Sequence, residues 1–250
     1  ESLQVSTMGY ATHSWIEIGN AGYLTSTMTI EVRNREGQLV HAEQRAISPR
    51  AQSNFYVNPH IGPRNVGSVR ILCKETDTVL VQSAFYSRAS EHSGLVSAAY
   101  VSQARAISSA ELHDQLSIAI NTHLGDHRSA NWLKISNDDT VAGELSVVIR
   151  NSTGDAIRSQ QLTISSSGTL DVDLHSTVGQ QFIGSVDVTP LSANLKIRAE
   201  LLRVFLDQRG EIVKIIPITS TLVSSTAHAC REDRFRSNIY IASDVTPVNW

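Results

Sequence analysis

Trp15-Ile16-Glu17-Ile18-Gly19-Asn20 is the stretch that decides the fold, because it returns later in the chain as Trp132-Leu133-Lys134-Ile135-Ser136-Asn137. Trp132 follows Trp15 by 132 − 15 = 117 positions, and Trp250 follows Trp132 by 250 − 132 = 118 positions. The three tryptophans therefore stand at the same point of a repeating unit. The sequence predicts two tandem units, followed by either the beginning of a third or a natural C-terminal strand.

The repeat keeps a constant offset over more than fifty positions. Asn34 matches Asn151, Gly37 matches Gly154, and Gly67-Ser68-Val69 matches Gly184-Ser185-Val186, all 117 residues apart. Beyond these positions we expect a single deletion in the second unit, which sets Phe85 opposite Leu201 at an offset of 116.

Apolar residues alternate with polar ones throughout, which indicates β-strands. Met28, Ile30 and Val32 form one such run, and it ends at Asn34 to Gly37, where a glycine in the left-handed conformation closes a short hairpin. Short strands that are separated by frequent turn signals are typical of an antiparallel β-sandwich. We predict an all-β chain of two tandem sandwiches, immunoglobulin-like in the broad sense, with an extra C-terminal strand.

The expected domain boundaries follow from the repeat. The first sandwich covers residues 1–110, the second 111–226, and a C-terminal segment 227–250. Between the units, Ser108 to Leu116 is expected to be a short turn of helix or a linker. In the last segment Ile239, Tyr240 and Ile241 form a strand-like run that is able to pair with an open sheet edge.

Composition excludes several classes of partner. The formal net charge is −3 and charged residues make up only 18% of the chain, which gives no electrostatic footprint for nucleic acid or an anionic membrane surface. No apolar run approaches the roughly 18 residues that a membrane span needs, so we expect no membrane insertion.

The tryptophans are the most informative side chains. Alternation places Trp15 with Glu17 and Trp132 with Lys134, on the face opposite the aliphatic pairs. One interpretation is that a loop or the neighbouring unit covers them, and the other is that they form an aromatic platform for a partner or a sugar ring. We take Trp15, Trp132 and Trp250 as candidate contact residues, together with the run from Ile239 to Ile241.

Candidates for metal or redox chemistry are weak. His113, His123 and His127 are the best set for a metal, but the loop expected around Gly125 fixes no ligand geometry, so we predict neither metal nor other cofactor. Cys73 and Cys230 either form a disulfide, which would tie the first unit to the segment after the second, or remain two separate thiols. The sequence has no nucleophile elbow and no phosphate-binding glycine loop, so we predict that the chain is not an enzyme.

The motif Trp-[Ile/Leu]-x-[Ile/Leu]-x-Asn, with the later Asn-x-x-Gly and Gly-Ser-Val, resembles the tandem immunoglobulin-like β-sandwich repeats of exported and surface-located bacterial proteins. The resemblance covers nearly the whole chain and concerns the fold rather than an active site. It implies a secreted, periplasmic or cell-surface location and a structural or adhesive role, with a protein partner or self-assembly. A pair of carbohydrate-binding modules is the alternative function, and a metal-dependent enzyme is the second alternative.

Overall fold

The computed structural model describes residues 2–6, 12–62, 65–74, 78–88, 96–104, 115–122, 128–193, 195–208 and 212–223. Its strands are β1 (Ser2–Ser6), β2 (Thr12–Asn20), β3 (Ser26–Asn34), β4 (Leu39–Ile47), β5 (Gln52–Tyr56), β6 (Val66–Leu72), β7 (Val79–Arg88), β8 (Val96–Gln103), β9 (Gln115–Asn121), β10 (Arg128–Asn137), β11 (Gly143–Asn151), β12 (Ala156–Ile164), β13 (Thr169–Asp173), β14 (Ile183–Pro190), β15 (Ile197–Leu206), β16 (Ile212–Thr219) and β17 (Thr221–Val223). Two single-turn helices, α1 (Asn58–Ile61) and α2 (His175–Val178), complete the described elements.

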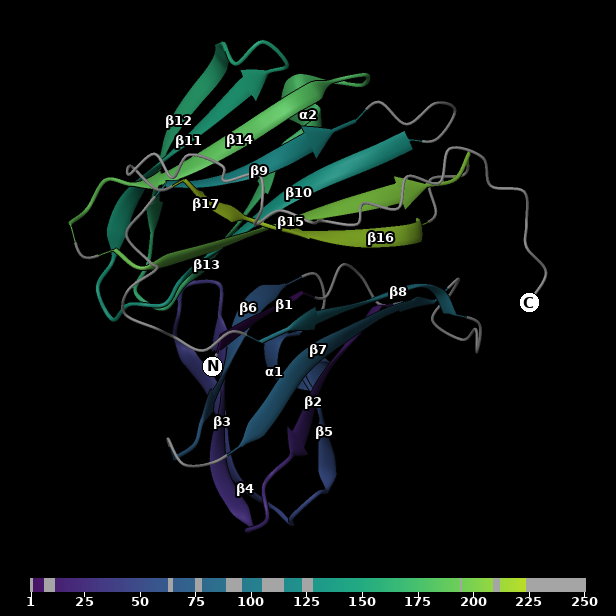
Figure 1. Ribbon diagram of the computed structural model, residues 1–250, viewed down its shortest axis with the longest axis vertical. Coiled ribbons are helices and arrows are strands. Elements are labelled where there is room, and N and C mark those ends of the chain that lie inside the picture. Colours follow the sequence, from purple (N-terminus) through teal and green to yellow (C-terminus); the bar gives the residue numbers. More distant parts are fainter. Residues whose placement is uncertain are drawn as a thin grey trace, which may run out of the picture.

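The strands form four antiparallel sheets in two sandwich-like bodies (Figure 1). In the first body, which we call unit 1, sheet A has the order β1-β6-β3-β4 and sheet B the order β5-β2-β7-β8. In unit 2, sheet C has the order β12-β11-β14-β9-β17 and sheet D the order β13-β10-β15-β16. The predicted all-β class with two antiparallel sandwiches is confirmed.

The two units share one topology. Each strand of sheets A and B has its counterpart in C and D, and α1 corresponds to α2 at the same offset of 117. Among the described strands only β17 lacks a counterpart; it pairs with β9, the first strand of unit 2. The alternation seen in the sequence sets the inner faces, since Ile16 and Ile18 are completely buried, as are Leu133 and Ile135.

The register corrects one detail of the repeat. Trp15 pairs with Ala84 across β2 and β7, and Trp132 pairs with Leu202 across β10 and β15. The offset in this region is therefore 202 − 84 = 118, so unit 2 has gained one residue rather than lost one. Offsets of 116 and 118 differ by one period of strand alternation, so both keep the same residues on the inner face.

The asparagine that ends the repeated motif has a structural role in both units. The Asn20 side-chain amide donates to the carbonyl oxygens of Leu24 (2.8 Å) and Ile47 (2.9 Å), and its oxygen accepts from the Gly22 backbone amide. Asn137 makes the equivalent bonds in unit 2 and is 1% exposed. Each asparagine thus fixes the turn after its strand to the end of the neighbouring hairpin.

The region between the units lies mostly outside the described residues. Strand β8 ends at Gln103 and β9 begins at Gln115, so the expected boundary near residue 110 falls in an interval of which nothing is described. The helix or linker expected over residues 108–116 is wrong at its end, where Leu116 is a buried strand residue of β9. None of the helices in the described ranges has the length and hydropathy to cross a membrane.

Candidate functional site

Trp15 lies on the outer face of sheet B, in a group of aromatic side chains. Its ring stacks on that of Tyr56, with 4.6 Å between ring centroids, and the Tyr56 hydroxyl lies 2.8 Å from Nδ1 of His13. Tyr86 is the cross-strand neighbour of His13, and Ala84 that of Trp15. We call this surface, with Glu17 and its hydrogen-bond donor Gln82, the Trp15 face.

The Trp15 face is partly exposed, and its histidine and tyrosine side chains are kept neutral. The rings of His13, Trp15, Tyr56 and Tyr86 are all of intermediate exposure. Burial, and secondarily the charge of Arg88, lowers the pKa of His13, whereas burial raises the pKa of Tyr56. Near neutral pH this surface therefore presents uncharged aromatic rings, with the carboxylate of Glu17 and the cation of Arg88 near them.

Trp132 occupies the same position in unit 2 but has a different environment. The outer face of sheet D, which carries it, packs against strands β7 and β8 of unit 1 (Figure 1). We call the residues in this contact the junction cluster: Phe85, Ala98 and Tyr100 from unit 1, and Ala130, Trp132, Leu202, Val204, Leu206, Ile212 and Ile215 from unit 2. Leu202 and Val204 are 1% and 2% exposed, although they point away from the core of their own sandwich.

Tyr100 links the junction cluster to charged groups of unit 2. It stacks on Phe85, with 5.0 Å between ring centroids. Burial, followed by the carboxylates of Glu200 and Asp171, raises the pKa of its hydroxyl. Two residues further along β8, Ser102 of unit 1 donates a 3.2 Å hydrogen bond to Glu200 of unit 2.

A hairpin of unit 1 makes a second contact between the units. The backbone amide of Thr169 donates a 2.9 Å hydrogen bond to the carbonyl oxygen of Arg35, in the turn between β3 and β4. In the same turn Gly37 is buried and has a φ of 81°. A Cβ atom on Gly37 would lie 1.9 Å from the carbonyl oxygen of Ser166, so only glycine fits this approach.

Charged groups of the two units also act on one another across the junction. Asp138 of unit 2 is buried and forms an ion pair with Arg198. Arg70 of unit 1 lies near both, and beside it Arg33 pairs with Glu31 at 2.8 Å. Burial, and then Arg33, lowers the pKa of Arg70, while Asp138 and Glu31 act in the opposite direction. The units are thus joined by apolar and backbone contacts, and Asp138 acts electrostatically on Arg70 across the junction.

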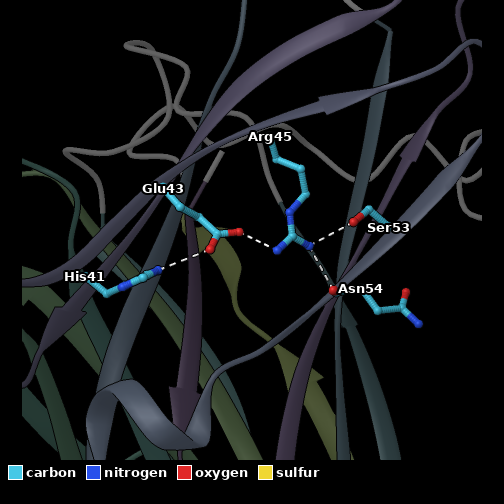
Figure 2. Close-up of polar contacts among 5 residues, drawn as sticks. All are labelled: His41, Glu43, Arg45, Ser53 and Asn54. Carbon is cyan, nitrogen blue, oxygen red and sulfur yellow. Dashed lines mark hydrogen bonds and ion pairs between the residues drawn. The ribbon is translucent and has the colours of Figure 1, made fainter.

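A further polar cluster lies between β4 and β5, which are edge strands of the two sheets of unit 1 (Figure 2). Glu43 lies 3.3 Å from Nε2 of His41 and forms an ion pair with Arg45, which donates to Ser53 and to the carbonyl of Asn54. The His41 ring stacks on His60, 3.8 Å between centroids, and both stack on Phe55. We call His41, Glu43, Arg45 and His60 the edge cluster.

The edge cluster is specific to unit 1. The counterparts of Arg45 and Ser53 at the offset of 117 are Leu162 and Leu170, which pack on the core of unit 2. No local motif in the sequence singles out these residues, since they lie on β4 and α1 and their contact partners on β5. The only signal was the exchange of apolar for polar residues between repeats.

Most other predicted site residues fall outside the described ranges. These are Trp250, Ile239, Tyr240, Ile241, His113, His123, His127 and Cys230. Cys73 is exposed, and its disulfide to Cys230 stays a prediction. Within the described ranges no group of three or more His, Cys, Asp and Glu side chains is arranged to hold a metal ion.

Comparison with known proteins gives only distant structural likeness. No family model matches the sequence. No curated protein matches it either. Among solved structures, a calcium-binding mutant of β-glucuronidase 2 from Bacteroides uniformis is 10% identical, with a TM-score of 0.18, over 88% of this chain and 26% of that one. A glycosyl hydrolase family 2 member from Bacteroides cellulosilyticus is 8% identical, with a TM-score of 0.18, over 89% and 28%.

An anti-sigma factor domain-containing protein is 10% identical, with a TM-score of 0.22, and the match covers 90% of this chain and 81% of that one. The chain spans about a quarter of the length of the two glycosidases it matches. At these identities and TM-scores the likeness says nothing about activity.

Proposed function

We propose that the chain is a non-enzymatic structural or adhesive protein that acts outside the cytosol, in a surface layer, in adhesion or in an extracellular assembly. In this role the two sandwiches are a rigid pair of blocks that present surfaces at a fixed angle. The resemblance of the repeated motif to exported tandem sandwiches supports the location.

The junction between the units is the observation that carries the proposal. Apolar side chains and a backbone hydrogen bond between Thr169 and Arg35 join unit 1 to unit 2, and the buried charge of Asp138 acts on Arg70 of unit 1. Flexibly linked domains generally have small, polar interfaces. A contact with a buried apolar cluster instead favours one fixed arrangement of the two units, which is what a spacer or scaffold requires.

Two measurements test this function. Antibodies against the chain, applied to intact and to broken cells of the organism that makes it, should label the intact cells; labelling of broken cells alone would contradict the proposal. Small-angle scattering of the purified chain should give a single elongated shape whose maximum dimension does not change with salt. A broad distribution of shapes would contradict a rigid arrangement.

Glycan binding is the second candidate function, and the Trp15 face is the observation in its favour. Stacked Trp15 and Tyr56 rings beside Glu17 and Gln82 combine an apolar platform with polar groups, as sugar-binding sites do. Titration with oligosaccharides should then shift the tryptophan fluorescence of the wild type and leave that of Trp15→Ala unchanged. An unchanged wild-type spectrum across a glycan panel would remove this candidate.

A further inference from the structure

The Trp15 face is the unit 1 counterpart of a surface that is buried in unit 2. Through the strand registers, His13, Trp15, Ala84 and Tyr86 occupy the positions of Ala130, Trp132, Leu202 and Val204, which are unit 2's part of the junction cluster. In unit 1 the same place in the fold is partly exposed and rich in aromatic rings. The same face is therefore buried between the units in unit 2 and partly exposed in unit 1.

The surface of unit 1 that packs against sheet D also has a counterpart in unit 2. In unit 1, Phe85, Ala98 and Tyr100 receive the outer face of sheet D, and their counterparts in unit 2 are Arg203, Lys214 and Ile216. Lys214 is exposed, with its Nζ 5.8 Å from the centroid of the Phe205 ring. We call Arg203, Phe205, Lys214 and Ile216 the basic end of unit 2.

The two surfaces have complementary chemistry. The Trp15 face has neutral aromatic rings, with the carboxylate of Glu17 and the guanidinium of Arg88 near them, whereas the basic end has two cations next to apolar side chains and no carboxylate among its four residues. Arginine and lysine bind well to the faces of tryptophan and tyrosine rings. At the junction inside the chain both surfaces are apolar. In the proposed second contact one surface is aromatic and the other carries cations, so both surfaces have changed, and the changes suit each other.

The hairpin that supports the junction is repeated as well. Gly154, the counterpart of Gly37, has a φ of 90° and no atom within 4 Å of a Cβ placed on it, whereas Gly37 touches Ser166. One difference is unfavourable for close packing. Ala51 stands where unit 2 has Gly168, whose own Cβ would lie 2.9 Å from the Arg35 carbonyl oxygen. A second contact of this type is therefore looser than the junction.

We propose that chains associate head to tail, with the basic end of unit 2 of one chain docked on the Trp15 face of unit 1 of the next. Such a contact joins two different surfaces, so it leaves one of each unused and continues into a filament or open array. This inference rests on the proposed structural function and specifies its partner as a second copy of the same chain.

Light scattering with sedimentation velocity over a concentration series tests the association in the full chain. The average mass of the wild type should rise with concentration. Trp15→Ala, which removes the aromatic platform, and Lys214→Glu, which reverses an exposed charge, should each weaken association by about tenfold or more, because central aromatic and cationic residues dominate such contacts. Leu39→Ala and Arg158→Glu, at exposed positions of β4 and β12, are the matched controls and should associate like the wild type.

Mixing the two defective variants gives the sharper test. Trp15→Ala retains its basic end and Lys214→Glu retains its Trp15 face, so an equimolar mixture should form dimers and nothing longer. Face-to-face pairing of two Trp15 faces would instead leave Lys214→Glu fully associating and the mixture without new dimers, which would overturn the head-to-tail contact.

A wild-type chain that stays monomeric up to millimolar concentration would also overturn it. In that case small-angle scattering would still test the rigid two-unit shape independently of the association. Far-ultraviolet circular dichroism and melting temperatures of each variant would exclude misfolding as the cause of lost association.

Discussion

Arg70 of unit 1 occupies the position that Asp187 occupies in unit 2, so the repeat reverses the charge at one site of the two sandwiches. Asp187 is satisfied inside its own unit, by Arg150 at 2.7 Å and Ser117 at 2.8 Å. Arg70 lies beside another cation, Arg33, and two carboxylates act on it: Glu31 of its own unit and Asp138 of the other. Docking of unit 2 therefore adds a second carboxylate near the two cations of unit 1.

Substitution of Asp138 tests this dependence. Asp138→Asn leaves Arg198 without its buried counter-charge and Arg70 with Glu31 alone, and should lower the free energy of unfolding by about 3 kcal/mol, since breaking a buried pair from one side is costly. Glu144→Gln, at an exposed position of unit 2, is the control and should change it by less than about 0.5 kcal/mol. Urea denaturation measures both, and equal effects would contradict the role of Asp138.

The hairpin glycines offer a matched pair of substitutions. Gly37→Ala combines a positive φ with a clash at Ser166 and should cost about 3 kcal/mol, because the backbones of two units must separate. Gly154→Ala has the same backbone strain without the clash and should cost about 1 kcal/mol. Thermal denaturation of both variants gives the comparison, and equal losses would mean that the turn does not hold the units together.

Alkaline pH should weaken the junction through Tyr100. Its pKa is raised in the folded chain, so the neutral hydroxyl is favoured, and the resulting stability is complete below the unfolded pKa near 10 and lost as the pH rises further. Stability measured from pH 8 to 12 should therefore fall above pH 10. The fall should be smaller in Tyr100→Phe than in Tyr56→Phe, because Tyr56 lies on the Trp15 face, outside the junction.

Mild acid should loosen the edge cluster. Burial first, and then His41, lowers the pKa of His60, with Glu43 acting in the opposite direction. A lowered histidine pKa adds stability that is complete above the unfolded value of about 6.5 and is lost as the pH falls through the folded value. Because water screens this edge, we expect a loss below about 1 kcal/mol between pH 7 and 5.

His60→Gln should reduce that acid-dependent loss, which denaturation at the two pH values would measure. His13 also has a lowered pKa, so His13→Gln is the comparison. If the pH dependence is unchanged in His60→Gln and abolished in His13→Gln, the edge cluster is not its source.

Strand alternation predicted the faces of this fold correctly but not its register. Ile16, Ile18, Leu133 and Ile135 could be assigned to the inner faces because alternation specifies which residues share a side. The same period of two cannot distinguish a deletion from an insertion, since Phe85 opposite Leu201 or opposite Arg203 gives equally regular alternation. Only the cross-strand pairs of β7 and β15 decide between them.

The contact between the units could not be predicted from the repeat. A duplication indicates which positions are equivalent, but the junction joins non-equivalent surfaces: β7 and β8 of unit 1 and the outer face of sheet D. The edge cluster could not be predicted for a related reason, since its side chains come from β4 and α1 and contact β5, and these elements are brought together only by the closed sandwich. The helix α1 is a single turn, too short for a helical period to be seen.

Strand β17 determines how unit 2 would respond to stretching. It pairs antiparallel with β9, and its last residue, Val223, lies opposite Gln115, the first residue of β9. A tension applied to the chain before Gln115 and after Val223 therefore acts at the same end of this strand pair. The bonds then open one after another, as in a zipper, instead of resisting together in shear. With only three residue pairs to separate, β17 would be released at low force and lengthen the chain before the sandwich itself yields.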